Sequence, residues 1–168
     1  MIILDTNVLS ALMRVEPEPK ILSWLDRQPR TSIWTTSVTL LEIRFGLQIL
    51  PAGRKRAALL QALELLIHKI DRRVAAFDGD AANHAADLMA NRQKHGRPVD
   101  LRDTMIAGIV LARHASLATR NIAHFADIAA TLIDPWAMAA SPIPGVFTGK
   151  TKIELPSKPY MVVLFEKA

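Results

Sequence analysis

The sequence predicts an α/β fold in three layers, with a central, mostly parallel sheet and helices on both of its faces. Short apolar runs alternate along the chain with longer segments of helical pattern. The connections between successive runs are long enough to hold helices, and such crossovers join parallel strands. Half of the residues are hydrophobic, 22% are charged and none is cysteine. This composition allows a sizeable core and excludes both disulfides and wholesale disorder.

Five short segments are predicted as strands because they are apolar or β-branched and are bounded by turn residues. The first is the run Ile-Ile-Leu, which has no polar position and is typical of a strand buried on both faces. The third, 74–77, is either a brief strand or an extended link. In chain order the segments are 2–4, 33–35, 74–77, 117–119 and 131–133.

Six segments are predicted as helices from their apolar spacing and their boundary residues. Ser37 is predicted to cap the third helix, and Gly96 and Pro98 are predicted to end the fifth. The fourth helix repeats leucine and isoleucine on one side, as a helix packed on a core does. In chain order the helices are 9–13, 17–27, 37–47, 54–69, 80–95 and 100–113.

The composition changes after Trp136. Residues 138–168 hold four of the ten prolines and two of the seven glycines, and they include the apolar run 160–165. We therefore divide the chain into a folded domain, 1–137, and a proline-containing C-terminal extension of unknown role, 138–168. The extension is a genuine appendage, a frameshifted end or a non-native remnant of an expression vector.

The charge balance favours a polyanionic partner such as nucleic acid. The chain has 21 Lys and Arg against 16 Asp and Glu, a formal net charge of +5, although many proteins that bind no nucleic acid share this balance. The first residues do not resemble a signal peptide, and no apolar stretch approaches 18 residues. We therefore expect a soluble cytoplasmic protein with no membrane partner.

Basic residues gather near helix ends, where they could contact RNA phosphates or simply remain solvated. Arg54, Lys55 and Arg56 open the long fourth helix, and Arg102 stands near the start of the sixth. Further candidates for phosphate contacts are Arg72, Arg73, Arg92, Lys94 and Arg97.

Asp5 follows the first predicted strand and precedes a helix. Ligands of open α/β sheets bind outside the carboxyl ends of the strands, so a carboxylate there can coordinate a hard cation or bind a polar substrate. Asp is equally a favoured helix N-cap, and position alone does not separate the two roles. Thr6 and Asn7 add a hydroxyl and an amide beside it.

Three further polar side chains each allow two interpretations. Glu42 has apolar neighbours on a predicted helix. A buried Glu is rare unless it is paired or bound to a metal, and the alternative is that Glu42 faces solvent. Asp103 precedes an apolar helical run, where it complements the helix dipole or points out from the end of the sheet. Asn121 follows the strand 117–119 and is a turn residue or part of the same crevice. Only a fold that joins strand ends can bring these residues together.

Five motifs occur in order along the chain: 3–9 (ILDTNVL), 39–46 (TLLEIRFG), 103–108 (DTMIAG), 119–125 (TRNIAHF) and 134–136 (DPW). Together they resemble the PIN-domain ribonucleases, and most closely the VapC-type toxins of bacterial toxin–antitoxin pairs. The resemblance covers residues 1 to about 137. It implies a PIN-like three-layer fold with a mostly parallel sheet.

The resemblance implies a metal site made of acidic residues. Asp5, Glu42 and Asp103 match the metal-binding, catalytic acids of the family. Asn121 stands at the position of the family's fourth acid and would be a weaker ligand because an amide carries no charge. The residues that match the family's supporting positions are Thr6, Asn7 and Thr119. Mg²⁺, or Mn²⁺ in its place, suits such oxygen ligands.

The function that the resemblance implies is a metal-dependent endoribonuclease, the toxin of a VapBC-type pair. A metal-activated water would attack an RNA phosphodiester in line. The partners would be RNA, a VapB-like antitoxin and a second copy of the chain, as a homodimer or a larger assembly. No histidine is required as a base, and the five histidines, which show no ligand spacing, are predicted to be surface or packing residues.

Two alternatives remain open. Because Asn121 replaces the fourth acid, the chain could be a catalytically decayed PIN module that binds RNA or an antitoxin. It could also be a phosphotransferase with Asp5 as the covalent nucleophile. Enzymes of that second kind usually carry another Asp two residues later, where this chain has Asn7.

Overall fold

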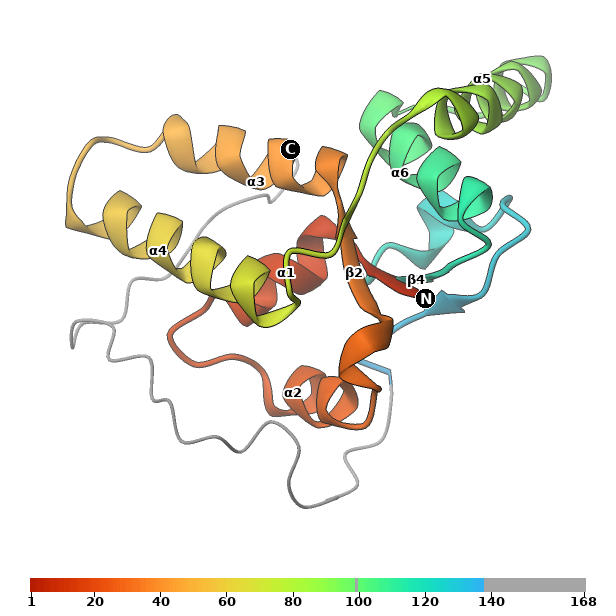
Figure 1. Cartoon of the computed structure of the whole chain (residues 1–168). Helices are drawn as coiled ribbons and strands as arrows, with labels where there is room; N and C mark the ends of the chain where they lie inside the picture. Colours follow the sequence, from red (N-terminus) through yellow and green to blue (C-terminus); the bar gives the residue numbers. More distant parts are fainter. Residues whose placement is uncertain (99, 138–168) are drawn as a thin grey trace.

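The computed structural model describes residues 1–98 and 100–137, and it confirms the three-layer α/β fold (Figure 1). The sheet has five parallel strands in the order β3-β2-β1-β4-β5. The strands are β1 (Ile2–Leu4), β2 (Ile33–Thr36), β3 (Val74–Ala75), β4 (Ser116–Ala118) and β5 (Leu132–Ile133). The predicted extension 138–168 lies outside the described residues.

The six predicted helices are all present, with ends shifted by a few residues at most. They are α1 (Thr6–Leu12), α2 (Pro19–Asp26), α3 (Ser37–Gln48), α4 (Arg54–Lys69), α5 (Gly79–Lys94) and α6 (Leu101–Ala112). Two short 3-10 helices, η1 (Arg30–Ser32) and η2 (Ile122–Phe125), complete the described elements. Figure 1 shows α1 to α4 on one side of the sheet and α5 with α6 on the other. Within the described residues, no helix has both the length and the apolar character needed to cross a bilayer.

The side chains on the two faces of the sheet pack into two separate hydrophobic cores. Successive side chains of a strand point to opposite faces, so Leu4 joins the core beneath α1 to α4 while Ile3 joins the core beneath α5 and α6. Both side chains are almost fully buried. This explains why β1 contains no polar residue, and it fixes the central position of the strand.

The order of the strands reverses at β1, which has β2 on one side and β4 on the other. In the register of this sheet Leu4 lies opposite Ala118, and the amide N of Asp5 donates to the carbonyl O of Ala118 at 3.0 Å. The residues that follow the two strands, Asp5 and Thr119, therefore emerge side by side. Such a reversal point is where ligands of parallel α/β sheets bind.

Helices α5 and α6 approach each other closely at Gly108. A Cβ atom added there would lie 2.4 Å from the carbonyl O of Ala81 and 2.9 Å from the Cβ of Ala85. Because the first of these neighbours is backbone, no larger residue fits without moving a helix. The contact sets α5 firmly against α6 on the second face of the sheet.

The predicted cap of α3 was wrong by one residue. The N-cap is Thr36, whose Oγ1 accepts from the amide N of Thr39 at 2.9 Å. Ser37 instead accepts a hydrogen bond from the amide N of Phe77 at 3.1 Å and so holds the chain after β3. Both hydroxyl residues are good caps, and strand β2 runs through Thr36 before the helix begins.

Candidate active site

Asp5 is buried at the carboxyl end of β1, with 4% of its surface exposed. Its Oδ1 accepts from the amide N of Thr6 at 2.7 Å, so Asp5 caps α1. Its Oδ2 accepts from Nδ2 of Asn7 and from Oγ1 of Thr119, both at 2.7 Å. Asp5 is therefore both the N-cap of α1 and the residue at the reversal point of the sheet, two roles that the sequence left as alternatives.

The environment of Asp5 disfavours its charge. The pKa of Asp5 is raised to about 6. Burial is the main cause and the nearby carboxylates of Asp103 and Glu42 add to it, while the hydrogen bonds from Thr119 and Thr6 offset only part of the rise. In the described part of the chain, Asp5 forms no ion pair with Lys, Arg or His. A cation beside Asp5 would relieve this electrostatic cost.

Glu42 reaches the same place from α3. The hydroxyl of Thr6 donates to Oε2 of Glu42, and Nε of Arg102 lies 3.4 Å from Oε1. The side chain is mostly buried, so the interpretation of Glu42 as a solvated residue was wrong. Helices α1, α3 and α6 therefore meet around this carboxylate.

Asp103 stands in the first turn of α6, below the N-cap Asp100, whose Oδ1 accepts from the amide N of Asp103 at 3.1 Å. Oδ2 of Asp103 lies 2.8 Å from Nδ1 of His124. His124 is predicted from the sequence to be a surface or packing residue, and its contact with Asp103 was not predicted. The missed signal was its place in the motif 119–125, three residues after Asn121.

The supporting residues form a small network between β1 and β4. Nδ2 of Asn7 donates to Oγ1 of Thr119 at 3.1 Å, and Oδ1 of Asn7 accepts from the amide N of Arg120 at 3.1 Å. Oγ1 of Thr119 also accepts from the amide N of Asn121 at 3.0 Å. The structure thus places Asn7 and Thr119 against Asp5, on the line between the two central strands.

In the described structure Asn121 forms hydrogen bonds at the site through its backbone, not through its side chain. Its amide N donates to Thr119, its carbonyl O accepts from the amide N of His124 at 3.0 Å, and the residue is exposed. Among the described residues, its side-chain amide takes no part in the hydrogen bonds of the three acids. Its predicted role as a weak ligand stays a prediction.

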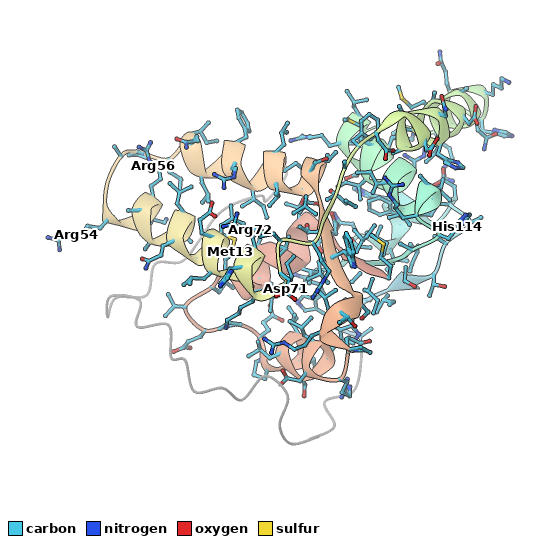
Figure 2. The ribbon with its side chains drawn as sticks, in the orientation of Figure 1. Met13, Arg54, Arg56, Asp71, Arg72 and His114 are labelled. Carbon is cyan, nitrogen blue, oxygen red and sulfur yellow. The ribbon has the colours of Figure 1, made fainter. Side chains whose placement is uncertain are left out.

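The basic residues predicted to contact RNA divide by location. Arg102 lies in the site, paired with Glu42. Figure 2 shows Arg54 and Arg56 at the outer end of the arm formed by α3 and α4, and Lys55 lies between them in the chain. These three lie outside the site, and their contact with RNA stays a prediction.

Two other basic candidates serve the fold instead. Arg92 is 4% exposed and pairs with Asp127 at 2.8 Å, so the hypothesis that it contacts phosphate was wrong. Nε of Arg73 donates to the carbonyl O of Ile33 at 3.0 Å and ties β2 to the chain before β3. Sequence position alone does not show which arginines of a helix or turn face inward.

The donor types of the site fit a hard divalent cation, because Asp5, Glu42 and Asp103 offer carboxylate oxygens. All three side chains are engaged in hydrogen bonds with the protein. Within 1–98 and 100–137, no three acidic or histidine side chains lie close enough to enclose one ion. The chemistry of the donors therefore fits Mg²⁺.

A sequence model described as the PIN domain matches residues 2–130. The chain belongs to the PIN-domain family. Within it this chain is of the VapC type: the VapC ribonuclease Y4jK of Sinorhizobium fredii is 36% identical over 140 residues, which cover 83% of this chain and 100% of that relative. A second sequence model, described as a domain of unknown function (DUF5605), matches 118–166, less than half of the chain.

Solved PIN structures agree. The crystal structure of FitAcB from Neisseria gonorrhoeae has a TM-score of 0.75 at 28% identity and covers 82% of this chain and 100% of that one. VapBC-5 from Mycobacterium tuberculosis, described as a member of the VapBC family of toxin-antitoxin systems, has a TM-score of 0.55 at 30% identity, with 77% and 93% covered. The predicted family and fold are thus confirmed.

Proposed function

We propose that this PIN protein is a Mg²⁺- or Mn²⁺-dependent endoribonuclease and the toxin of a toxin–antitoxin pair. The observation that carries the proposal is Asp5, buried without a cationic partner in the described structure and bordered by Glu42 and Asp103. Burying an acid in this way is costly unless a cation joins it. The relationship to a VapC ribonuclease supports the choice of RNA as the substrate.

In the proposed mechanism Asp5, Glu42 and Asp103 hold the ion. When bound, Mg²⁺ or Mn²⁺ supplies an activated water and positive charge for the scissile phosphate. Thr119 and Asn7 orient Asp5 through hydrogen bonds to Oδ2. The phosphotransferase alternative is disfavoured because Asn7 stands where such enzymes usually carry a second Asp.

Arg102 supports substrate binding in this mechanism. Its side chain is paired with Glu42 on one side and is about half exposed. An arginine at the edge of an acidic site can bind a phosphate oxygen and offset the repulsion between RNA and the carboxylates. The other phosphates of the RNA would lie on the remaining basic surface of the domain.

An apolar cavity of about 270 Å³ between α1, α2 and α4 supports the proposed antitoxin partner. Leu12, Met13 and Leu22 are among its lining residues, and Arg14 and Lys69 add positive charge. Figure 2 shows Met13 in the middle of this part of the molecule. A VapB-like segment with apolar and acidic side chains would match such a cavity.

A homodimer, or a larger toxin–antitoxin assembly, is supported by a second surface. Leu41, Phe45 and Ile49 lie four residues apart on α3 and at its end, and each is more than half exposed. Residues four apart share one face of a helix, so the three side chains form an apolar stripe. A stripe of this kind is typical of a surface that another protein covers.

The test of the proposed function is RNA cleavage by the purified full chain with Mg²⁺ or Mn²⁺, and with EDTA in their place. Cleavage that needs the ion is expected, with 5′-phosphate and 3′-hydroxyl ends, and it should be lost in Asp5→Asn and Asp103→Asn. Asp87→Asn, an exposed acid on α5, is the matched control. Cleavage that persists in EDTA or in Asp5→Asn would refute the proposal. Mapping the fragments after induced expression would then identify the RNA.

Asn121 favours one second candidate, a decayed PIN module that binds without cutting. The experiment that separates the two candidates is Asn121→Asp, which restores a carboxylate at that position. If the chain is a decayed module, wild type shows no metal-dependent cleavage and the variant gains it. If the chain is a nuclease, wild type already cleaves.

A further inference from the structure

The carboxylate of Asp103 has a single side-chain partner among the described residues, His124. Nδ1 of His124 lies 2.8 Å from Oδ2 of Asp103. Because an ionised carboxylate can only accept hydrogen bonds, Nδ1 carries the proton in this contact. The His124 side chain is 46% exposed and that of Asp103 13%, so the histidine covers the solvent side of the acid.

Both members of this pair are fixed by one buried group, the guanidinium of Arg92 on α5. Nη2 of Arg92 donates to the carbonyl O of His124 at 2.9 Å, and Nη1 donates to Oγ1 of Thr104, the residue after Asp103, at 2.8 Å. Arg92 is itself held by Asp127, which accepts from Nε and Nη2, both at 2.8 Å. The turn that carries the imidazole and the helix that carries the carboxylate are therefore joined beneath the contact.

The other histidines differ in this respect. His95 contacts the carbonyl O of Asn91 on its own helix, at 2.8 Å, and His84 is exposed on α5. Neither contacts a site acid. Figure 2 shows His114 on the far side of the molecule from the α3–α4 arm. The contact with Asp103 is therefore specific to His124 and is not a general property of surface histidines in this chain.

We infer that His124 is a positioning residue, which orients the Asp103 carboxylate for ion binding through Nδ1. The inference rests on the proposed function, because Asp103 acts on RNA only if the chain is a metal-dependent nuclease. Ligand carboxylates in metal sites are themselves held by hydrogen bonds, and loss of such a partner typically costs about 10-fold to 100-fold in metal affinity or activity. Without the imidazole, the Asp103 side chain would be free to rotate into solvent.

Two amide substitutions separate the two ring nitrogens. In His124→Asn the amide N can take the place of Nδ1, whereas in His124→Gln it takes the place of Nε2. His124→Ala removes both, and His84→Asn is the matched control on an exposed histidine. For each full-length variant we would measure the Mn²⁺ dissociation constant by titration calorimetry, the melting temperature, and kcat and KM for RNA cleavage at saturating Mn²⁺.

The expected result is a Mn²⁺ affinity reduced about 10-fold to 100-fold in His124→Ala and His124→Gln, with most of it restored in His124→Asn. KM for RNA should change little, and the melting temperature without the ion should match wild type because the side chain is half exposed. Wild-type Mn²⁺ affinity in His124→Ala would overturn the inference. So would the reverse order, with Gln active and Asn inactive, because the ring would then act through Nε2.

The two proposals fail in distinguishable ways. Wild type that neither binds Mn²⁺ nor cleaves RNA overturns the proposed function and this inference with it. Wild type that binds and cleaves, together with His124 variants of unchanged Mn²⁺ affinity, overturns this inference alone.

Discussion

Two buried carboxylates of this protein, Asp5 and Asp127, have opposite electrostatic environments. Both carboxylate oxygens of Asp127 accept hydrogen bonds from Arg92, and Nη1 of Arg97 lies 3.3 Å from Oδ2 of Asp127. The guanidinium of Arg92 lowers the pKa of Asp127, while burial raises that of Asp5 to about 6. The protein neutralises Asp127 internally and leaves Asp5 without a cation in the described structure. Asp127 therefore has the environment of a structural ion pair, and Asp5 that of a binding site.

The largest effect is expected from breaking the neutralised pair. Arg92→Met would leave Arg97 as the one basic partner of Asp127 among the described residues, and it would also remove the hydrogen bonds to Thr104 and His124. Removing one partner of a buried ion pair costs about 3–5 kcal/mol. Urea unfolding at pH 7 measures the loss.

The double variant Arg92→Met with Asp127→Leu sharpens this result, because it leaves no unpaired charge. Arg97 also loses its partner in this variant, but its side chain is about half exposed and remains solvated. The double variant should therefore recover much of the lost stability. Equal stability of Arg92→Met and wild type would show that the ion pair is not what holds this region.

The pH dependence of the free energy of unfolding should reveal the raised pKa of Asp5. The pKa of Asp5 is about 6 in the folded chain against an ordinary value of 3.8, so the folded state binds the proton more tightly. The stabilising contribution is therefore complete below about pH 4 and is lost as the pH rises through 6, by about 3 kcal/mol in all. Unfolding of ion-free wild type and Asp5→Asn at several pH values checks the difference. A difference that does not change between pH 4 and pH 6.5 would contradict this account of Asp5.

Adding a divalent ion should reverse that loss at neutral pH. An ion that binds only the folded chain stabilises it by about 2.7 kcal/mol at 100 times its dissociation constant. Melting temperatures with and without Mg²⁺ or Mn²⁺ measure this gain. It should disappear in Asp5→Asn and persist in Asp87→Asn, and equal gains in both variants would place the ion elsewhere.

The smallest effect is expected at the exposed pair of Arg44 and Glu64, each about half exposed. Surface ion pairs contribute at most about 1 kcal/mol, and many contribute nothing measurable. Arg44→Met should therefore change the unfolding free energy far less than Arg92→Met. Arg44→Met is therefore the matched control for Arg92→Met, because it removes an arginine from an ion pair that is exposed to solvent.

Elements with strong local signals were predictable from the sequence. The helix 54–69 has its observed ends because Gly53 precedes an amphipathic run, and β1 is apolar because both its faces are covered. Asp5, Asp103 and Thr119 lie at strand or helix ends, so a parallel sheet was enough to bring them together. The proximity of these residues depends on the parallel topology of the sheet, which the hydrophobic periodicity of the sequence predicts.

What the sequence did not predict depends on how helices face each other. Arg92 looks like any basic residue of an amphipathic helix until α5 is packed on α6 through Gly108. The contact of His124 with Asp103 joins residues that are 21 positions apart. The motif 119–125 indicates that His124 lies near the site, but it does not indicate which acid His124 contacts. The orientation of a side chain at such a contact follows from tertiary packing, which single-sequence patterns do not encode.

The hydrogen bond between Thr119 and Asp5 spans 114 positions of the chain. Translation proceeds from the N-terminus at about 5–20 residues per second. While a ribosome is still making the segment before β4, the emerging polypeptide already contains Asp5, Glu42 and most of the helices, yet the two central strands cannot pair. The proposed catalytic site therefore cannot assemble until almost the whole domain has been synthesised. A copy truncated before β4 would lack the hydrogen bond between Thr119 and Asp5 and could not form the site that the proposed cleavage requires.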